Sequence, residues 1–87
     1  MIIDFEWDEG KNEHNIEKHN IDFKDAARIF LDENRLELPS PKNGEDRIKI
    51  IGQIENLLFV VVYIRREDAI RIISARRASA QERRQYD

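Results

Sequence analysis

The sequence contains no cysteine and little glycine or proline, with three glycines and two prolines among 87 residues. Without cysteine, the protein has neither disulfide bonds nor thiolate metal ligands. The three glycines are scattered, which excludes the glycine-rich phosphate loop of P-loop enzymes. No serine lies in a nucleophile-elbow context, so the serine chemistry of α/β-hydrolases is excluded as well.

Long hydrophobic runs are also missing. The longest apolar run, residues 57–64, is far shorter than the roughly 20 residues that a membrane-spanning helix needs. The first residues carry Asp4 and Glu6 and no basic cluster, so we expect no signal peptide. The length predicts a single domain over residues 1–87, and we expect a cytoplasmic protein without membrane contact.

The charge is uneven along the chain. The net charge of −3 argues against a general nucleic-acid binder. However, residues 1–46 carry 13 acidic and 6 basic side chains, whereas residues 65–87 carry 4 acidic side chains and 7 arginines. This asymmetry is compatible with two electrostatic surfaces on one small body, although composition alone favours ordinary surface salt bridges.

The first part of the chain predicts a strand followed by two helices. Apolar Ile3, Phe5 and Trp7 alternate with carboxylates, which is typical of a half-buried strand. Asp8 is expected to cap a helix that runs to about His19 and ends at Asn20. Asp22 is expected to cap a second helix that ends at Asn34, and its predicted core face is Phe23, Ala26, Ala27 and Phe30.

The second part predicts four strands and a short helix. Residues 35–38 are expected to form a short strand, because Leu36 and Leu38 alternate with Arg35 and Glu37, and a loop with both prolines follows. A strand begins at Arg47, the apolar run 57–64 is the expected central strand, and residues 69–76 form the last strand. Ser79 and Glu82 match a capping box that begins a C-terminal helix. We therefore predict an α+β fold, an antiparallel sheet of four to five strands with two N-terminal-half helices packed on it and a short C-terminal helix.

Several polar side chains are candidates for chemistry. The predicted first helix has one apolar residue, so it either packs through polar groups or lines a site, with Asn12, Asn15, Ile16 and His19 on one face. His19 is suited to general acid or base chemistry, although a histidine near a helix end is more often a favourable terminal charge. Lys11 and Lys18 point the same way, but a lysine is usually only solvated. The two histidines and scattered carboxylates match no metal-ligand spacing, so we expect no metal or other cofactor.

Two arginines and a tyrosine complete the set. Arg47 and Arg76 lie at predicted strand ends, where long cations could hold a phosphate and stabilise a transition state. The alternative is that each arginine pairs with a carboxylate from the acidic half. Tyr86 could donate a proton or stack on a base, but an aromatic residue in a tail is usually a packing residue.

Two ordered segments resemble a known family. The first has tryptophan and aspartate, lysine, asparagine, a lysine–histidine pair and phenylalanine, at Trp7, Asp8, Lys11, Asn15, Lys18, His19 and Phe23. The second runs through residues 70–79 and ends with Glu82, Arg83 and Tyr86. Together they resemble the BrnT toxin family over nearly the whole chain. Asn20 stands where that family usually has glycine, and Gly10 is a less usual residue in the opening helix.

The resemblance implies a RelE-like fold and an RNA-cleaving toxin that inhibits translation. It also implies a cognate BrnA-type antitoxin with a ribbon-helix-helix part, which would contact operator DNA on behalf of the complex. Such a complex would contain at least two copies of each chain. The antitoxin could dock on the acidic half of the chain or cover the arginine side.

The mechanism that this suggests is metal-independent cleavage of single-stranded RNA through its 2′-hydroxyl. We expect Arg47 and Arg76 to hold the phosphate, Lys11 and His19 to transfer protons, and Lys18 and Tyr86 to contact RNA. One alternative is a non-catalytic binding module that acts as a co-repressor subunit with a DNA-binding partner. Another is a structural dimerisation domain.

Overall fold

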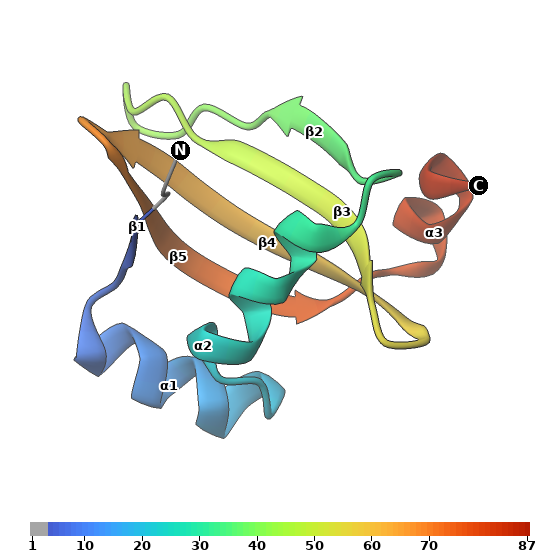
Figure 1. The fold of residues 1–87 in the computed structure, drawn as a ribbon, viewed down its shortest axis with the longest axis horizontal. Coiled ribbons are helices and arrows are strands. Elements are labelled where there is room, and N and C mark those ends of the chain that lie inside the picture. Colours follow the sequence, from blue (N-terminus) through green and yellow to red (C-terminus); the bar gives the residue numbers. More distant parts are fainter. Residues whose placement is uncertain (1–3) are drawn as a thin grey trace.

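The computed structural model describes residues 4–87 and places five strands in one sheet, in the order β1-β5-β4-β3-β2 (Figure 1). The α+β class is confirmed, with three α-helices and one 3₁₀ helix in this part of the chain. The elements in chain order are β1 (Asp4–Glu6), α1 (Glu9–His19), α2 (Phe23–Ala26), the 3₁₀ helix η1 (Ala27–Leu31), β2 (Leu36–Pro39), β3 (Ile48–Ile54), β4 (Leu57–Arg66), β5 (Ala69–Arg77) and α3 (Ala80–Tyr86).

The sheet is mixed, so the prediction of an antiparallel sheet is wrong for one strand. β1 runs parallel to β5, with Phe5 opposite Ile70, while the other neighbouring strands are antiparallel. Alternating apolar residues predict a strand but carry no information about the direction of its partner. A parallel pair needs a long connection, and here all the other strands and α1 lie between β1 and β5 in the chain. Ile3 of the predicted strand lies outside the described residues.

The apolar run does form the central strand, as predicted. β4 pairs with β3 on one side and with β5 on the other, and it extends to Arg66, two residues beyond the predicted end. β5 likewise extends by one residue to Arg77. Val60 and Val61 point to opposite faces of the sheet and are both buried, while Val62 and Ile64 on the face of Val60 are half-buried, so the strand lacks the polar alternation of a surface strand.

The helix ends follow the predicted caps. Asp8 accepts a hydrogen bond from the Lys11 backbone N–H at 2.9 Å, and Asn20 ends α1 in the left-handed conformation with φ of 57°. The capping box of α3 is complete, because Ser79 and Glu82 each accept a hydrogen bond from the other's backbone N–H.

The predicted second helix is two shorter pieces. α2 passes into η1 at Ala27, and η1 ends at Leu31 rather than at Asn34. A 3₁₀ helix has three residues per turn, so Ile29 lies on the same side as Ala26 and is fully buried. The α-helical spacing used for the prediction did not include Ile29 in the core face. Ile29 packs tightly on β3, since a Cβ added to Gly52 would lie 2.6 Å from the Ile29 Cγ1 atom.

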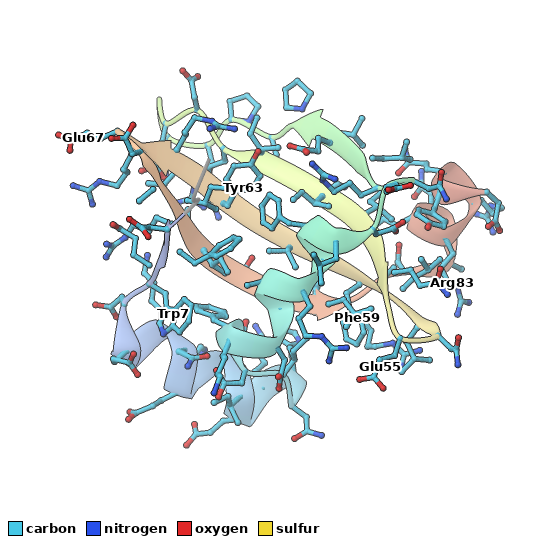
Figure 2. All side chains as sticks on the ribbon, in the orientation of Figure 1. Trp7, Glu55, Phe59, Tyr63, Glu67 and Arg83 are labelled. Carbon is cyan, nitrogen blue, oxygen red and sulfur yellow. The ribbon has the colours of Figure 1, made fainter. Side chains whose placement is uncertain are left out.

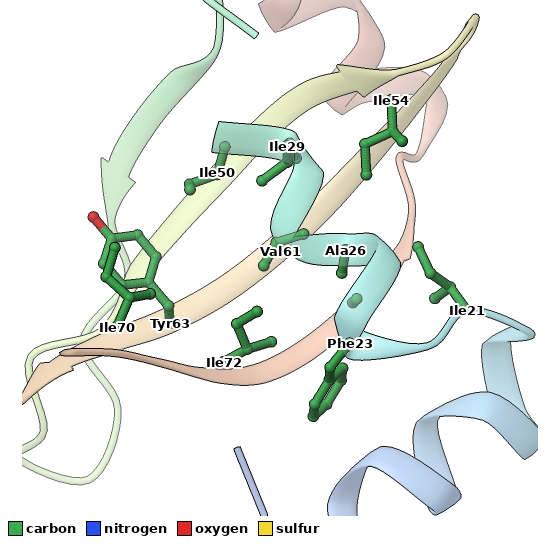
Figure 3. Packing of buried hydrophobic residues seen from close by; sticks show 11 residues of the cluster. Ile21, Phe23, Ala26, Ile29, Ile50, Ile54, Val61, Tyr63, Ile70 and Ile72 are labelled. Carbon is green, nitrogen blue, oxygen red and sulfur yellow. The ribbon is translucent and has the colours of Figure 1, made fainter. Parts of the chain in front are cut away.

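The core lies between the sheet and α2–η1 (Figure 3). Phe23, Ala26 and Ile29 from the helical side contact a set of fully buried strand residues that includes Ile50, Val61 and Ile72. Trp7 packs edge-on against Phe23 and lies where β1 passes into α1 (Figure 2). None of the helices in the described chain has the length and apolar character that crossing a bilayer demands.

The face of the sheet opposite this core is here called the open face. Along each strand, its side chains alternate with those that point into the core. α3 covers one end of it, where Glu82 binds Lys49 and Arg76 and where Ile51 and Val60 are buried outside the main core cluster. The rest of the face is only half-buried. The strand register places on it Lys49, Val62, Ile64, Arg71, Ser74 and Arg76. Arg47, the residue before β3, falls on the same face as Lys49 by alternation along the chain.

Candidate functional site

Two buried asparagines fix α1 against the rest of the fold. The Asn15 side chain donates to the Ile21 carbonyl at 3.0 Å and accepts from the Ala75 backbone N–H of β5 at 3.1 Å. The Asn12 side chain accepts from the Phe23 N–H at 2.8 Å and donates to an Asp22 carboxylate oxygen at 3.0 Å. These bonds confirm the interpretation that α1 packs through polar groups that find partners, and they hold the adjacent side of α1 beside β5.

A pocket of about 390 Å³ opens between α1 and β5. Lys11, Lys18 and His19, which the sequence singled out separately, all line it. His14, the other histidine of α1, and Ser74, which sequence reasoning missed, line it too. No local pattern could have identified Ser74, because it reaches the pocket only through the packing of α1 beside β5. Among the described residues, neither Lys11 nor Lys18 forms an ion pair, so both ammonium groups are available to an anion.

His19 is half-buried at the end of α1, and its surroundings lower its pKa. Burial is the largest cause, and the positive charges of Lys18 and Arg76 and the neighbouring His14 act in the same direction. A lowered pKa favours the neutral imidazole at neutral pH, which is the form that accepts a proton. Arg76 is not among the lining residues, but it lies two positions after Ser74 on the same face of β5, beside the pocket.

Arg76 is held by a carboxylate from α3. Its guanidinium donates two hydrogen bonds to Glu82, at 2.7 and 2.9 Å, and Lys49 donates a third to the same carboxylate at 3.1 Å. These contacts, with the Ser79 N–H at 2.8 Å, hold the pKa of Glu82 far below its usual range. Because two cations share one carboxylate, this cluster carries surplus positive charge. Sequence reasoning did anticipate an acidic partner, but expected it from the N-terminal half.

Arg47 lies on the open face but away from the pocket. It precedes Ile48, which is paired with Tyr63, whereas Arg76 is paired with Val60. At about 3.3 Å per residue, this places the two arginines more than 10 Å apart along the strands. The Arg47 Nε atom is 2.7 Å from a Glu45 carboxylate oxygen. The structure therefore does not bring Arg47 together with Lys11 and His19.

Tyr86 is also remote from the pocket. Its hydroxyl donates to the Asp32 carboxylate at 2.7 Å, which raises the pKa of Tyr86 and ties the last turn of α3 to the residue after η1. This contact is the packing role that a tail aromatic usually has. Within residues 4–87, no three histidine, aspartate or glutamate side chains gather in an arrangement that could hold a metal ion.

The sequence of the chain was compared with known proteins and protein families. No curated protein matches the chain. A family model described as the ribonuclease toxin BrnT of a type II toxin–antitoxin system matches residues 7–82, which includes every residue that lines the pocket and also Arg76 and Glu82. Because that match covers most of the 87 residues, the chain belongs to the BrnT family of ribonuclease toxins.

Proposed function

We propose that this chain cleaves single-stranded RNA without a metal ion, at the pocket between α1 and β5. Membership of the family gives the chain RNA as a target and an antitoxin as a partner. The observation that carries the location is the convergence of Lys11, Lys18 and a His19 of lowered pKa on one pocket beside Arg76. Cations and a neutral imidazole are the groups that metal-independent RNA cleavage requires.

The reaction is an intramolecular displacement at phosphorus. The ribose 2′-oxygen forms a bond to phosphorus as the bond from phosphorus to the 5′-oxygen breaks. The proton of the 2′-hydroxyl passes to a base, and an acid donates a proton to the departing 5′-oxygen. The products are a 2′,3′-cyclic phosphate and a 5′-hydroxyl, and DNA is not a substrate because it lacks the 2′-hydroxyl.

The geometry favours one division of roles. His19 is the base, because its lowered pKa keeps the imidazole neutral. Lys11 donates the proton to the leaving oxygen, and Lys18 contacts the RNA backbone. Arg76 stabilises the negative charge that builds up on the phosphate. Arg47 binds RNA away from the reacting atoms. Tyr86 mainly anchors α3 through its hydrogen bond to Asp32, and any contact with RNA is secondary.

In the cell, this activity would inhibit translation by destroying messages. A BrnA-type antitoxin with a ribbon-helix-helix part would neutralise it and carry the complex, with at least two copies of each chain, to operator DNA. The acidic N-terminal half offers a surface for a basic antitoxin segment, and occlusion of the pocket by the antitoxin is the alternative. Binding without cleavage would instead identify the chain as a co-repressor subunit.

The direct test uses the purified chain and a labelled RNA oligonucleotide in the presence of EDTA. We expect unchanged cleavage in the chelator and products that end in a 2′,3′-cyclic phosphate. The matched oligonucleotide with 2′-deoxyribose throughout should remain intact. A rate that collapses in EDTA and returns with a divalent cation would contradict metal independence, and an intact RNA under all conditions would contradict the proposal itself.

The pH dependence of cleavage tests the role of His19. As a base of lowered pKa, His19 predicts a rate that rises with pH through a value below the ordinary 6.5 and then levels off. His19→Gln should lower the rate by about 100-fold and remove this acidic limb. His14→Gln, the matched control on the same pocket, should keep it. An acidic limb that persists in His19→Gln would assign the base to another group.

A further inference from the structure

The open face presents its side chains in rows that cross the sheet. Pairing between β3, β4 and β5 places Lys49, Val62 and Ser74 in one row. By the same pairing, Arg76 lies in the row on one side of it. Arg71, opposite Ile64, lies in the row on the other side. Successive rows are roughly 6–7 Å apart along the strands.

Cations outnumber acids on this face. It carries the five basic side chains Arg47, Lys49, Arg66, Arg71 and Arg76 and the four acids Asp4, Glu6, Glu45 and Glu82, the last three of which form ion pairs with these cations. Arg71 uses its Nη1 atom to reach Glu6 at 3.0 Å, and Arg47 uses its Nε atom to reach Glu45. Because a guanidinium has five N–H donors, both arginines keep donors for a phosphate, and exposed ion pairs are weak enough to be shared.

Half-buried aliphatic side chains lie between these cations. Val62 and Ile64 occupy the middle strand of the face, and no helix covers them in the described chain. An apolar surface flanked by cations suits a single strand of nucleic acid, whose bases need an apolar contact while its phosphates need positive charge. A double helix would present only its backbone to such a surface.

The open face is continuous with the pocket. Ser74 lines the pocket and also belongs to the row of Val62 and Lys49. Resting on the proposed function, we infer that the open face is an extended binding site for the single-stranded RNA that flanks the cleaved bond. In this arrangement Lys49, Arg47 and Arg71 contact backbone phosphates beyond the pocket, and Val62 and Ile64 contact bases.

Substrate length is the variable that tests this inference. One substrate is a dinucleoside monophosphate, and the other is an oligonucleotide of about twelve nucleotides, a length within the range of single-strand binding sites. The longer one contains a single ribonucleotide between randomised deoxyribonucleotide flanks. Arg71→Ala and Arg47→Ala should each raise KM for the long substrate by about fivefold through loss of a charge-assisted phosphate contact, and Arg71→Ala should leave dinucleotide cleavage unchanged.

Salt dependence gives a second readout. Each lost phosphate contact should reduce the slope of log affinity against log salt by about 0.7 for the long substrate. Arg28→Ala is the matched control, because Arg28 is also an exposed, ion-paired arginine but lies on η1, which packs on the covered face. Both the KM and the slope of Arg28→Ala should equal those of the unaltered chain.

The outcomes separate this inference from the proposed function. If the unaltered chain cleaves RNA but Arg71→Ala and Arg47→Ala act like Arg28→Ala on both substrates, the extended site is overturned and the pocket stands. If these variants leave RNA kinetics unchanged but weaken binding of the antitoxin, the open face is a protein interface instead. If neither substrate is cleaved, the proposed function fails first, and binding of an uncleavable all-deoxy strand, compared between variants, still decides whether the face holds a single strand.

Discussion

Arg76→Ala is expected to lower the rate of RNA cleavage by about 100-fold or more, because the phosphate loses the cation that stabilises its developing charge. Arg76 is the arginine whose charge acts on His19, and its side chain remains 40% exposed although Glu82 binds it. The rate is measured with a short RNA in single-turnover conditions, where substrate binding and chemistry can be separated. A full-rate Arg76→Ala protein would remove this residue from the site.

The same substitution also disturbs the fold, and a second variant separates the two effects. Without Arg76, the Glu82 carboxylate, only 9% exposed, keeps Lys49 and the Ser79 N–H as partners but loses its two shortest side-chain bonds. We expect a loss of about 1–3 kcal/mol in the free energy of unfolding, because a buried carboxylate loses a half-exposed partner whose interaction is weakened by solvent. Glu82→Gln added to Arg76→Ala removes the unpaired charge and should restore stability in thermal melts. Cleavage should stay low in the double variant, which assigns the loss of rate to Arg76.

Asn15→Leu is expected to lower the free energy of unfolding by about 3 kcal/mol, the largest effect on stability that we predict. Leucine fills a similar volume, but it leaves the Ala75 N–H and the Ile21 carbonyl in a buried region without partners. Denaturant unfolding followed by circular dichroism measures the change. Because the same bonds hold α1 beside β5, cleavage should fall even at temperatures where the variant is folded.

A matched amide-to-leucine change on the surface gives the control. Gln85 is exposed on α3, so Gln85→Leu should change the free energy of unfolding by less than about 0.5 kcal/mol. If Asn15→Leu were as mild as Gln85→Leu, the two hydrogen bonds would not be what fixes α1. In that case the pocket would have to be held by the apolar contacts of Trp7 and Phe23.

Local signals identified most of the elements, and their errors have physical causes. The Asp8 and Ser79 caps and the left-handed Asn20 are decided within a few residues, so sequence reasoning found them. The division of the second helix into α2 and η1 was missed because it depends on the packing of Ile29 against Gly52, a residue more than twenty positions away. The direction of β1 was missed because it depends on β5, at the other end of the chain.

The site divides in the same way. Lys11 and Lys18 lie seven residues apart on one helix, so their spacing predicted that they share a side, whereas His19 was predicted on the face of Asn12 and Asn15. The structure brings all three side chains to one pocket. Ser74 and Lys49 escaped notice because an isolated serine or lysine carries no signal until the fold gives it neighbours. Glu82 was identified as a capping residue, but its binding of Arg76 and Lys49 was not predicted. Arg47 and Arg76 looked equivalent at the level of strand ends. The register of β3, β4 and β5 separates them.

The sequence by itself determined the helix caps, the central strand and the α+β class, because each is encoded in a local pattern of residues. It also indicated that Lys11 and Lys18 share one side of α1. Only the tertiary structure decided that Asn12 and Asn15 fix α1 through buried hydrogen bonds and that Glu82 binds both Lys49 and Arg76. It also decided that Arg47 pairs with Glu45, away from the pocket. Such facts depend on strand pairing and on burial, which bring together side chains that are distant in the chain.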